Sequence, residues 1–438
     1  MKSHSKKPVK KAGSSSAASK SVLTDASRHL MNTYKRSGMI FTHGRGCYVF
    51  DQNGKKYLDF LGGIAVNALG YSYPDLVKII RREAGRAVHV SNLFHNPFQG
   101  PLAAKLAKWS GMDRAFFTNS GSEAVEGALK LARIAARKKQ GGAARRGGRF
   151  LALEHSFHGR TFGALSITHP LKYREPFEPL VPGVDFVRLN DVADLEAKFT
   201  DEVCAVIIEP IQGEGGIYPV TNEFWKRARE LATQHGAALI ADEIQCGLGR
   251  TGKEFAYQRL EGLPDIVIVA KPLAGGLPLG AFLAREEFAA SFSPGLHGST
   301  FGGGPLTCAT GLTFLDTVER KHLLANVRAR GAELKAALKK MATQFDFIRE
   351  VRGEGLMIGV DLDVEGTPYV AEALRQGLLI NCTHDHILRL LPPFILTAQQ
   401  VKEGLSKIES VLAKTERPAK SMAVPTAPAE ALTLAAAR

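Results

Sequence analysis

Short apolar runs alternate with amphipathic segments through the middle of the chain. Runs of this kind between turn residues are typical of buried strands in a parallel sheet, and they occupy 115–118, 150–153, 203–208, 238–241 and 266–270. The segment after the first run repeats apolar residues at helical spacing, and 224–234 is a further predicted helix. The alternation predicts an α/β fold, with a mostly parallel central sheet and helices on both faces.

The pattern changes towards both ends of the chain. Residues 26–61 predict a short helix and then a hairpin around Asn53-Gly54. Helices are predicted at 74–88, 101–109, 369–375 and 398–412, with a long helical stretch at 307–341 that breaks near Lys321. Strand-like runs follow at 348–351, 357–360 and 387–391. This smaller α+β pattern predicts a second domain, built from the C-terminal part and the N-terminal hairpin.

These patterns predict a division into five parts. They are a disordered basic tail (1–24), an N-terminal segment of the small domain (25–75), a large domain (76–320), a small domain (321–413) and a disordered tail (414–438). Disorder is expected in the tails because they lack a periodic apolar face.

The net charge of +14 is concentrated in two places. Lysines precede the first acid, Asp25, and a second acid-free run covers 133–149. A solvated tail and a solvated loop explain this better than a nucleic-acid surface. A polyanion-binding protein that uses these two runs is the alternative from another functional class.

Composition limits the compartment and the kind of site. No apolar run reaches the ~18 residues of a membrane span, so no membrane association is expected. The five cysteines are scattered and contain no CxxC, which favours a reducing compartment and argues against a metal site. We expect a cytoplasmic protein, or a mitochondrial one if the source is eukaryotic.

A carboxylate and an amine end two of the predicted strands. Asp242 follows 238–241, and Lys271 ends the run at 266–270. Ligands of parallel sheets bind beyond the carboxyl ends of the strands. A lysine and an aspartate there suit pyridoxal phosphate, because the lysine forms a Schiff base and the aspartate keeps the pyridine nitrogen charged. The alternatives are a surface lysine and a helix N-cap.

Further strand ends carry candidate binding residues. Ser120-Gly121-Ser122 begins a helix and suits either a phosphate or a plain N-cap. Phe157 could stack on a pyridine ring and Arg160 could pair with a carboxylate, or the two could be a core ring and a structural arginine. Arg389 lies among apolar residues, so it needs a carboxylate partner from Glu214 or from a substrate.

The chain resembles the class III, fold type I aminotransferases over about residues 28–413. The resemblance rests on six motifs in family order, Asn119–Ala124, Phe157–Thr161, Glu209–Gly215, Asp242–Gln245, Ala270–Leu273 and Ser299–Gly303. It implies pyridoxal phosphate as the cofactor and a homodimer with shared active sites.

The resemblance also implies a role for each residue. Lys271 and Asp242 are the catalytic pair, and the cofactor is bound by Gly121, Ser122, Phe157, Gln245 and, from the partner subunit, Thr300. Arg160, Ser299, Glu214 and Arg389 would bind substrate. Arg160 would take the α-carboxylate of the amine donor. Arg389 would bind the α-carboxylate of glutamate or 2-oxoglutarate. Glu214 would shield Arg389 when the other substrate is bound.

The implied reaction is transamination of the terminal amine of N2-acetylornithine with 2-oxoglutarate, as in arginine biosynthesis. Residues 62–67 leave an apolar space near Ile64 and Ala65, where ornithine-specific relatives place a tyrosine. An acyl group suits this space better than a free amine does. Ornithine, succinylornithine, 4-aminobutyrate and a carrier-linked amino acid remain alternative substrates.

Overall fold

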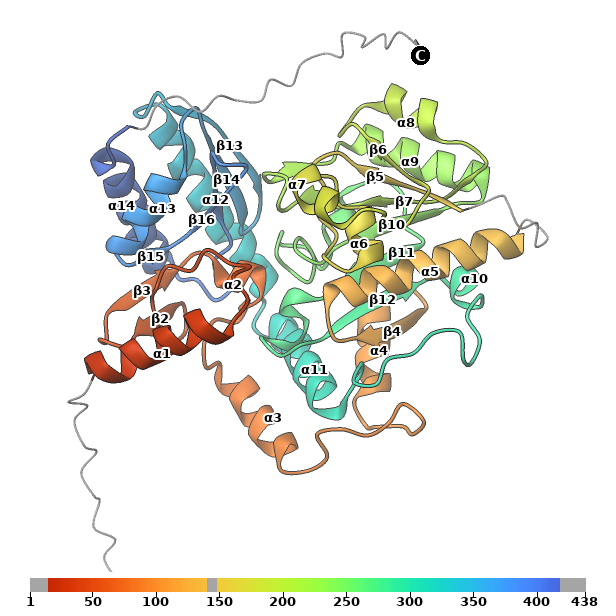
Figure 1. Ribbon diagram of the computed structural model, residues 1–438, viewed down its shortest axis with the longest axis horizontal. Helices are drawn as coiled ribbons and strands as arrows, with labels where there is room; N and C mark the ends of the chain where they lie inside the picture. Colours follow the sequence, from red (N-terminus) through yellow and green to blue (C-terminus); the bar gives the residue numbers. More distant parts are fainter. Residues whose placement is uncertain (1–14, 140–147, 418–438) are drawn as a thin grey trace, which may run out of the picture.

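A computed structural model describes residues 15–139 and 148–417 (Figure 1). Its central sheet has seven strands in the order β4-β12-β11-β10-β7-β5-β6. Their bounds are β4 Arg114–Thr118, β5 Arg149–Leu153, β6 Val184–Val187, β7 Val203–Ile208, β10 Ala238–Asp242, β11 Ile266–Val269 and β12 Gly280–Ala284. Only β12 runs antiparallel to its neighbours in this sheet. The predicted α/β class is therefore confirmed, although the sequence pattern missed β6 and β12.

The central strands are apolar on both faces because both faces are covered. Along β10, Ala238 and Ile240 enter the core that contains α5, Gly121–Lys139, whereas Leu239 and Ala241 enter the core on the opposite face. That opposite face is packed by α9, Asn222–His235, through residues such as Trp225. Continuous apolar runs, rather than alternating ones, follow from this two-sided burial.

The remaining elements before the C-terminal part complete the layers around the sheet. The helices are α3 Pro74–Ala84, α4 Gln99–Ser110, α6 Phe162–Ser166, α7 Leu171–Arg174, α8 Val192–Lys198, α10 Glu286–Ala289 and α11 Pro305–Arg320. Three 3-10 turns lie at Glu175–Phe177, Ala256–Arg259 and Lys271–Ala274, and a two-stranded ribbon pairs β8, Ile211–Gln212, with β9, Tyr218–Pro219.

Two smaller sheets complete the fold. The sheet β1-β2-β3-β15 is built from both ends of the chain, and the sheet β13-β14-β17-β16 comes from the C-terminal part alone. The N-terminal elements are α1 Ser15–His29, β1 Phe41–Arg45, β2 Tyr48–Asp51, β3 Lys56–Asp59 and α2 Gly62–Ala65. The C-terminal elements are α12 Leu323–Ala342, β13 Ile348–Glu354, β14 Met357–Leu362, α13 Thr367–Arg375, β15 Leu378–Leu379, β16 Asn381–Thr383, β17 Ile387–Leu390 and α14 Ala398–Lys414.

Strand β15 joins the two ends, because it pairs in parallel with β3. In Figure 1 the red N-terminal hairpin accordingly lies beside the blue C-terminal elements. On this basis we propose the domain division given by the sequence, with a large domain at 76–320 and a small domain built from 25–75 and 321–413. The predicted break near Lys321 is confirmed, since α11 ends at Arg320 and α12 begins at Leu323.

Some expectations for the ends of elements were wrong. Helix α1 begins at Ser15, so disorder is not found over 15–24; its residues from Lys20 to His29 are mostly exposed, which shows a helix formed without an apolar face. Helix α3 stops at Ala84, before Gly85, rather than at 88. Residues 140–147 of the basic run expected to form a solvated loop, and the tail beyond 417, lie outside the described residues. Within the described ranges, no helix is long and apolar enough to cross a membrane.

Candidate active site

A cavity of about 320 Å³ opens at the carboxyl ends of β10 and β11. It brings together seven of the residues that the sequence singled out, Gly121, Ser122, Phe157, Glu214, Asp242, Gln245 and Lys271. Parallel strand ends meet at one edge of a sheet, so segments far apart in the sequence converge here. The expectation that Asp242 and Lys271 share a site therefore agrees with their position.

Lys271 begins the turn that follows β11. Its backbone has φ 24°, a strained value for a residue other than glycine. Burial lowers the pKa of its amine, against the opposing effect of the carboxylates Asp242, Glu214 and Glu209. A lowered pKa leaves more of the amine neutral, and the neutral amine is the nucleophile.

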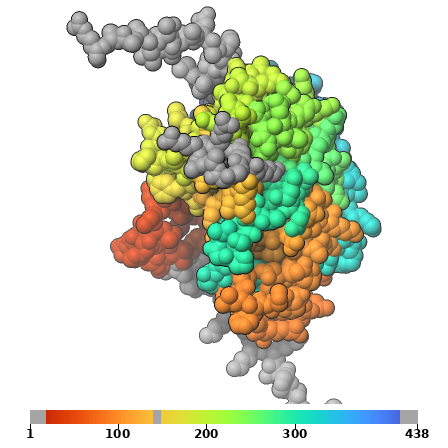
Figure 2. All heavy atoms as spheres, turned by 90° about the vertical axis from the view of Figure 1, so that its right-hand side faces the viewer, coloured from red at the N-terminus to blue at the C-terminus, as the bar shows by residue number. Residues whose placement is uncertain are grey.

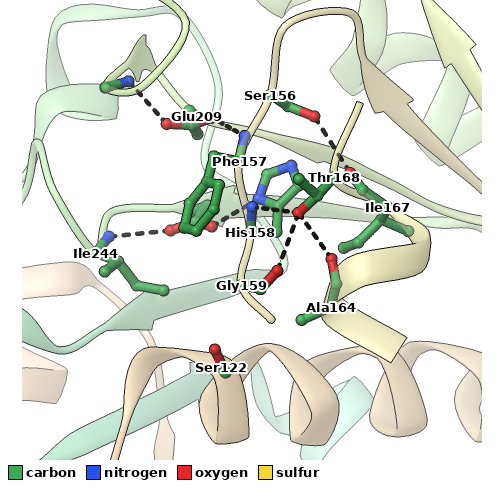
Figure 3. A network of polar contacts seen from close by, with 12 residues as sticks. Ser122, Ser156, Phe157, His158, Gly159, Ala164, Ile167, Thr168, Glu209 and Ile244 are labelled. Carbon is green, nitrogen blue, oxygen red and sulfur yellow. Dashed lines mark hydrogen bonds and ion pairs between the residues drawn. The ribbon is translucent and has the colours of Figure 1, made fainter. Parts of the chain in front are cut away.

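Asp242 is fixed by hydrogen bonds on both carboxylate oxygens. His158 Nδ1 donates to Oδ2 at 2.7 Å, and the backbone N–H of Ile244 donates to Oδ1 at 3.1 Å. The N–H of His158 donates in turn to Thr168 Oγ1 at 2.9 Å. Figure 3 shows this network, with Ser122 on the helix below it in that view. The donors hold the carboxylate in a fixed orientation at the cavity.

His158 is a residue that the sequence reasoning missed. It is buried, and no described residue bonds its Nε2. Its only signal was its place beside Phe157 in a motif after a strand. Its contact with Asp242 joins the segment that follows β5 to the end of β10, two strands away in the sheet, and such a pairing cannot be read from sequence spacing.

Glu209 supports the loop that carries Phe157. Its carboxylate accepts from the backbone N–H groups of Phe157 and Gly213, both at 2.9 Å. Burial, with some contribution from Asp242, raises the pKa of Glu209 to about 7, while His158 acts in the opposite direction. In the sequence, Glu209 begins one of the six family motifs, and the resemblance gave it no role.

Arg389 has the carboxylate partner that its apolar setting requires. The side chain is fully buried, and Nη1 donates to Glu214 Oε1 at 2.6 Å and to Gln245 Oε1 at 3.1 Å. Nε donates to Asn381 Oδ1 at 3.2 Å. Arg389 itself does not line the cavity; its guanidinium lies behind Glu214 and Gln245, which do, and the Glu214 carboxylate pairs with it.

Arg160, Ser299 and Thr300 lie outside the lining of this cavity. The guanidinium of Arg160 lies 5.5 Å from the ring of Phe157. Ser299 and Thr300 line a second cavity of about 370 Å³, which shares Asn119 with the first. Ser299 Oγ accepts from Asn119 Nδ2 at 3.3 Å. A single chain therefore does not bring the two hydroxyl residues to its own Lys271.

From the segment 62–67, Val66 is the residue that lines the cavity. Ile64, on which the sequence reasoning centred the apolar space, is 38% exposed, and Ala65 is fully buried beside it. Residues 63–65 have positive φ values, so the chain turns sharply here. This turn is the physical reason why Val66 faces the cavity and Ile64 does not.

The residues of the cavity fit pyridoxal phosphate. A carboxylate held by a histidine stands opposite a lysine amine, an aromatic ring lines the wall, and small residues begin α5 where free backbone N–H groups can take a phosphate. An added Cβ at Gly121 would contact Ile244 at 2.8 Å, so the helix start is closely packed. This fold and this site define a pyridoxal-phosphate-dependent transaminating enzyme of fold type I.

Comparison with known proteins identifies the family. The aminotransferase class-III model matches residues 31–412, and the chain belongs to this family. Acetylornithine aminotransferase of Aquifex aeolicus is 44% identical over 386 residues, which cover 88% of this chain and all of the relative. The enzyme of the same name from Methanocaldococcus jannaschii is 41% identical over 89% of this chain and 97% of its own.

Solved structures agree on the fold. Ornithine aminotransferase of Toxoplasma gondii has a TM-score of 0.87 and 30% identity, covering 90% of this chain and 95% of its own. Acetylornithine aminotransferase of Elizabethkingia anophelis has a TM-score of 0.80 and 31% identity, covering 90% and 99%. Class III aminotransferases depend on pyridoxal phosphate, which is therefore the cofactor of this protein.

Proposed function

We propose that the protein transfers the terminal amine of N2-acetylornithine to 2-oxoglutarate. The products are N-acetyl-L-glutamate 5-semialdehyde and glutamate, a step of arginine biosynthesis. The supporting observation is the pair of arginines beside the cavity. Arg389 is covered by Glu214, whereas Arg160 lies near Phe157 with no carboxylate partner in the described chain. A donor with one carboxylate needs one arginine, and an acceptor with two carboxylates can displace Glu214 and use Arg389.

Bound pyridoxal phosphate supplies an electron sink for the carbon that carries the amine. In this proposal Lys271 holds the cofactor and, once released, moves a proton through Nζ between the two carbons that flank the transferred nitrogen. Asp242, oriented by His158, keeps the ring nitrogen protonated. Phe157 would stack on the ring, and Gln245 would hold its phenolic oxygen. Backbone N–H groups of Gly121 and Ser122 hold the phosphate.

We also propose that the active form is a homodimer. Ser299 and Thr300 would then reach the active site of the other subunit, where Thr300 binds the phosphate. In the single chain Leu93 and Phe301 are 86% and 66% exposed. They lie near one another, since Asn92 Nδ2 donates to the carbonyl of Ser299 at 3.0 Å. In Figure 2 the orange and teal segments, which include these parts of the sequence, adjoin at the surface. A partner subunit would cover these side chains.

All five cysteines are free thiols, and four of them are buried. Free thiols without disulfides are typical of a reducing compartment. We therefore propose a cytoplasmic location, or the mitochondrial matrix if the source is eukaryotic.

Steady-state kinetics with N2-acetylornithine, ornithine, succinylornithine and 4-aminobutyrate, each with 2-oxoglutarate, tests the substrate. The proposal expects the highest kcat/KM for N2-acetylornithine, because Val66 gives the wall no polar group to hold a free α-amine. The similarity to an ornithine aminotransferase structure makes ornithine the second candidate. Equal or higher kcat/KM for ornithine would overturn the choice of substrate.

A further inference from the structure

The two candidate carboxylate-binding arginines are held in different ways. Arg389 is buried and ion-paired with Glu214. Arg160 is exposed and makes no ion pair within the described chain; its guanidinium carbon lies 3.9 Å from the ring centroid of Tyr173 and 5.5 Å from that of Phe157. A cation over an aromatic face at this distance is held by the ring electrons.

The two modes differ in what they leave for a substrate. A carboxylate partner uses the N–H donors of a guanidinium, so a substrate carboxylate must first displace it. A ring uses only the flat face, because the N–H donors of arginine point outward in the guanidinium plane. Arg160 is therefore held in place while its donors remain free for a bidentate contact with a carboxylate.

Tyr173 is placed to do this by its own packing. It lies in the short helix α7 and is half-buried, and its ring meets the Phe157 ring edge-on, with centroids 6.1 Å apart and planes at 83°. Lys172 Nζ also lies 5.3 Å from the Tyr173 ring. Tyr173 thus connects the aromatic wall of the cavity with the arginine beside it.

We infer that Tyr173 is a positioning and specificity-determining residue, which holds Arg160 ready for the α-carboxylate of the amine donor. The inference rests on the proposed function. Tyr173 does not touch the reacting atoms; it acts through Arg160. Loss of the ring should therefore weaken recognition of the carboxylate specifically, and not the chemistry that Lys271 performs.

The test compares Y173L, which removes the ring, with Y173F, which keeps it. Each variant and the unaltered enzyme is assayed with N2-acetylornithine and with N-acetylputrescine, which is the same amine without the carboxylate. The carboxylate preference is kcat/KM for N2-acetylornithine divided by kcat/KM for N-acetylputrescine. We expect Y173L to lower this preference about three- to thirtyfold, and Y173F to change it less than about twofold. The absorbance of the bound cofactor confirms that each variant is loaded.

A binding measurement gives a readout that does not depend on turnover. Calorimetry with N2-acetyl-L-norvaline, which lacks the reacting amine, should show a Kd raised by the same factor in Y173L and nearly unchanged in Y173F. If Y173L does not fold, Y173Q suits the half-buried position and replaces it.

The outcomes separate the two proposals. An unchanged carboxylate preference in Y173L, or an equal loss in Y173F, overturns the role of Tyr173 while leaving the proposed function intact. Failure of the unaltered enzyme to use N2-acetylornithine overturns the proposed function. It also overturns the assignment of N2-acetylornithine as the donor whose carboxylate Arg160 binds.

Discussion

Replacing Glu214 by glutamine should tighten the binding of 2-oxoglutarate. Glu214 Oε1 lies 2.6 Å from Arg389 Nη1, and the arginine is fully buried while the Glu214 side chain is 34% exposed. A hydrogen bond to a charged group contributes about 1.5–3 kcal/mol, and the exposure of Glu214 reduces this to about 1–2 kcal/mol. The α-carboxylate of 2-oxoglutarate has to replace this contact before it can bind Arg389.

E214Q keeps the shape and an acceptor oxygen but removes the charge. The apparent Kd of 2-oxoglutarate, taken from the single-turnover half-reaction, should fall about five- to thirtyfold. The KM of N2-acetylornithine should rise, because its cationic amine then meets an uncompensated Arg389. E261Q, at an exposed carboxylate, serves as the control and should change neither value. An unchanged or weaker affinity for 2-oxoglutarate in E214Q would refute the reasoning.

Two further predictions concern stability. An added Cβ at Gly331 in α12 would overlap the carbonyl of Gly355, so G331A should lower the free energy of unfolding by about 1–3 kcal/mol. The control is G100A in α4, where no atom lies within 4 Å of the added Cβ, and it should be neutral or stabilising by up to about 1 kcal/mol. Equal melting temperatures for the two variants would contradict this packing. Burial raises the pKa of Glu243 from 4.5 to about 7. The stability that this group contributes is therefore present below about pH 4.5 and is lost as the pH rises through about 7. Across that range the denaturant midpoint should fall with pH less steeply in E243Q than in the unaltered protein. An equal slope in the two proteins would count against this role of Glu243.

The sequence allowed the centre of the site to be predicted for a physical reason. Strands β10 and β11 are apolar on both faces, so they stand out as continuous runs, and their ends mark the sheet edge where Asp242 and Lys271 lie. Arg389 was equally readable, because an arginine among apolar residues must have a carboxylate partner, and Glu214 is that partner. The family resemblance then supplied roles that spacing alone left open.

The rest depended on contacts between distant segments. His158 meets Asp242 only after the strands are ordered in the sheet. Tyr173 meets Arg160 only after the connection between β5 and β6 has folded around α6 and α7. Strand β12 could not be recognised as antiparallel from its composition, since Gly280–Ala284 is short and buried like its parallel neighbours. Residues 15–24 of helix α1 were assigned to the disordered tail because no apolar stripe marks them. Periodicity shows which residues of an element are buried, but it does not show which distant side chains meet or in which direction a strand runs.

The position of the cofactor-bearing lysine is the claim on which the proposed mechanism depends. The most direct measurement is borohydride reduction of the purified enzyme, followed by peptide mass spectrometry. We expect the mass of a reduced pyridoxal phosphate adduct on Lys271, and no adduct or turnover above background in K271A. An adduct on another lysine, or full turnover in K271A, would contradict the proposed role of Lys271 at the edge of the sheet.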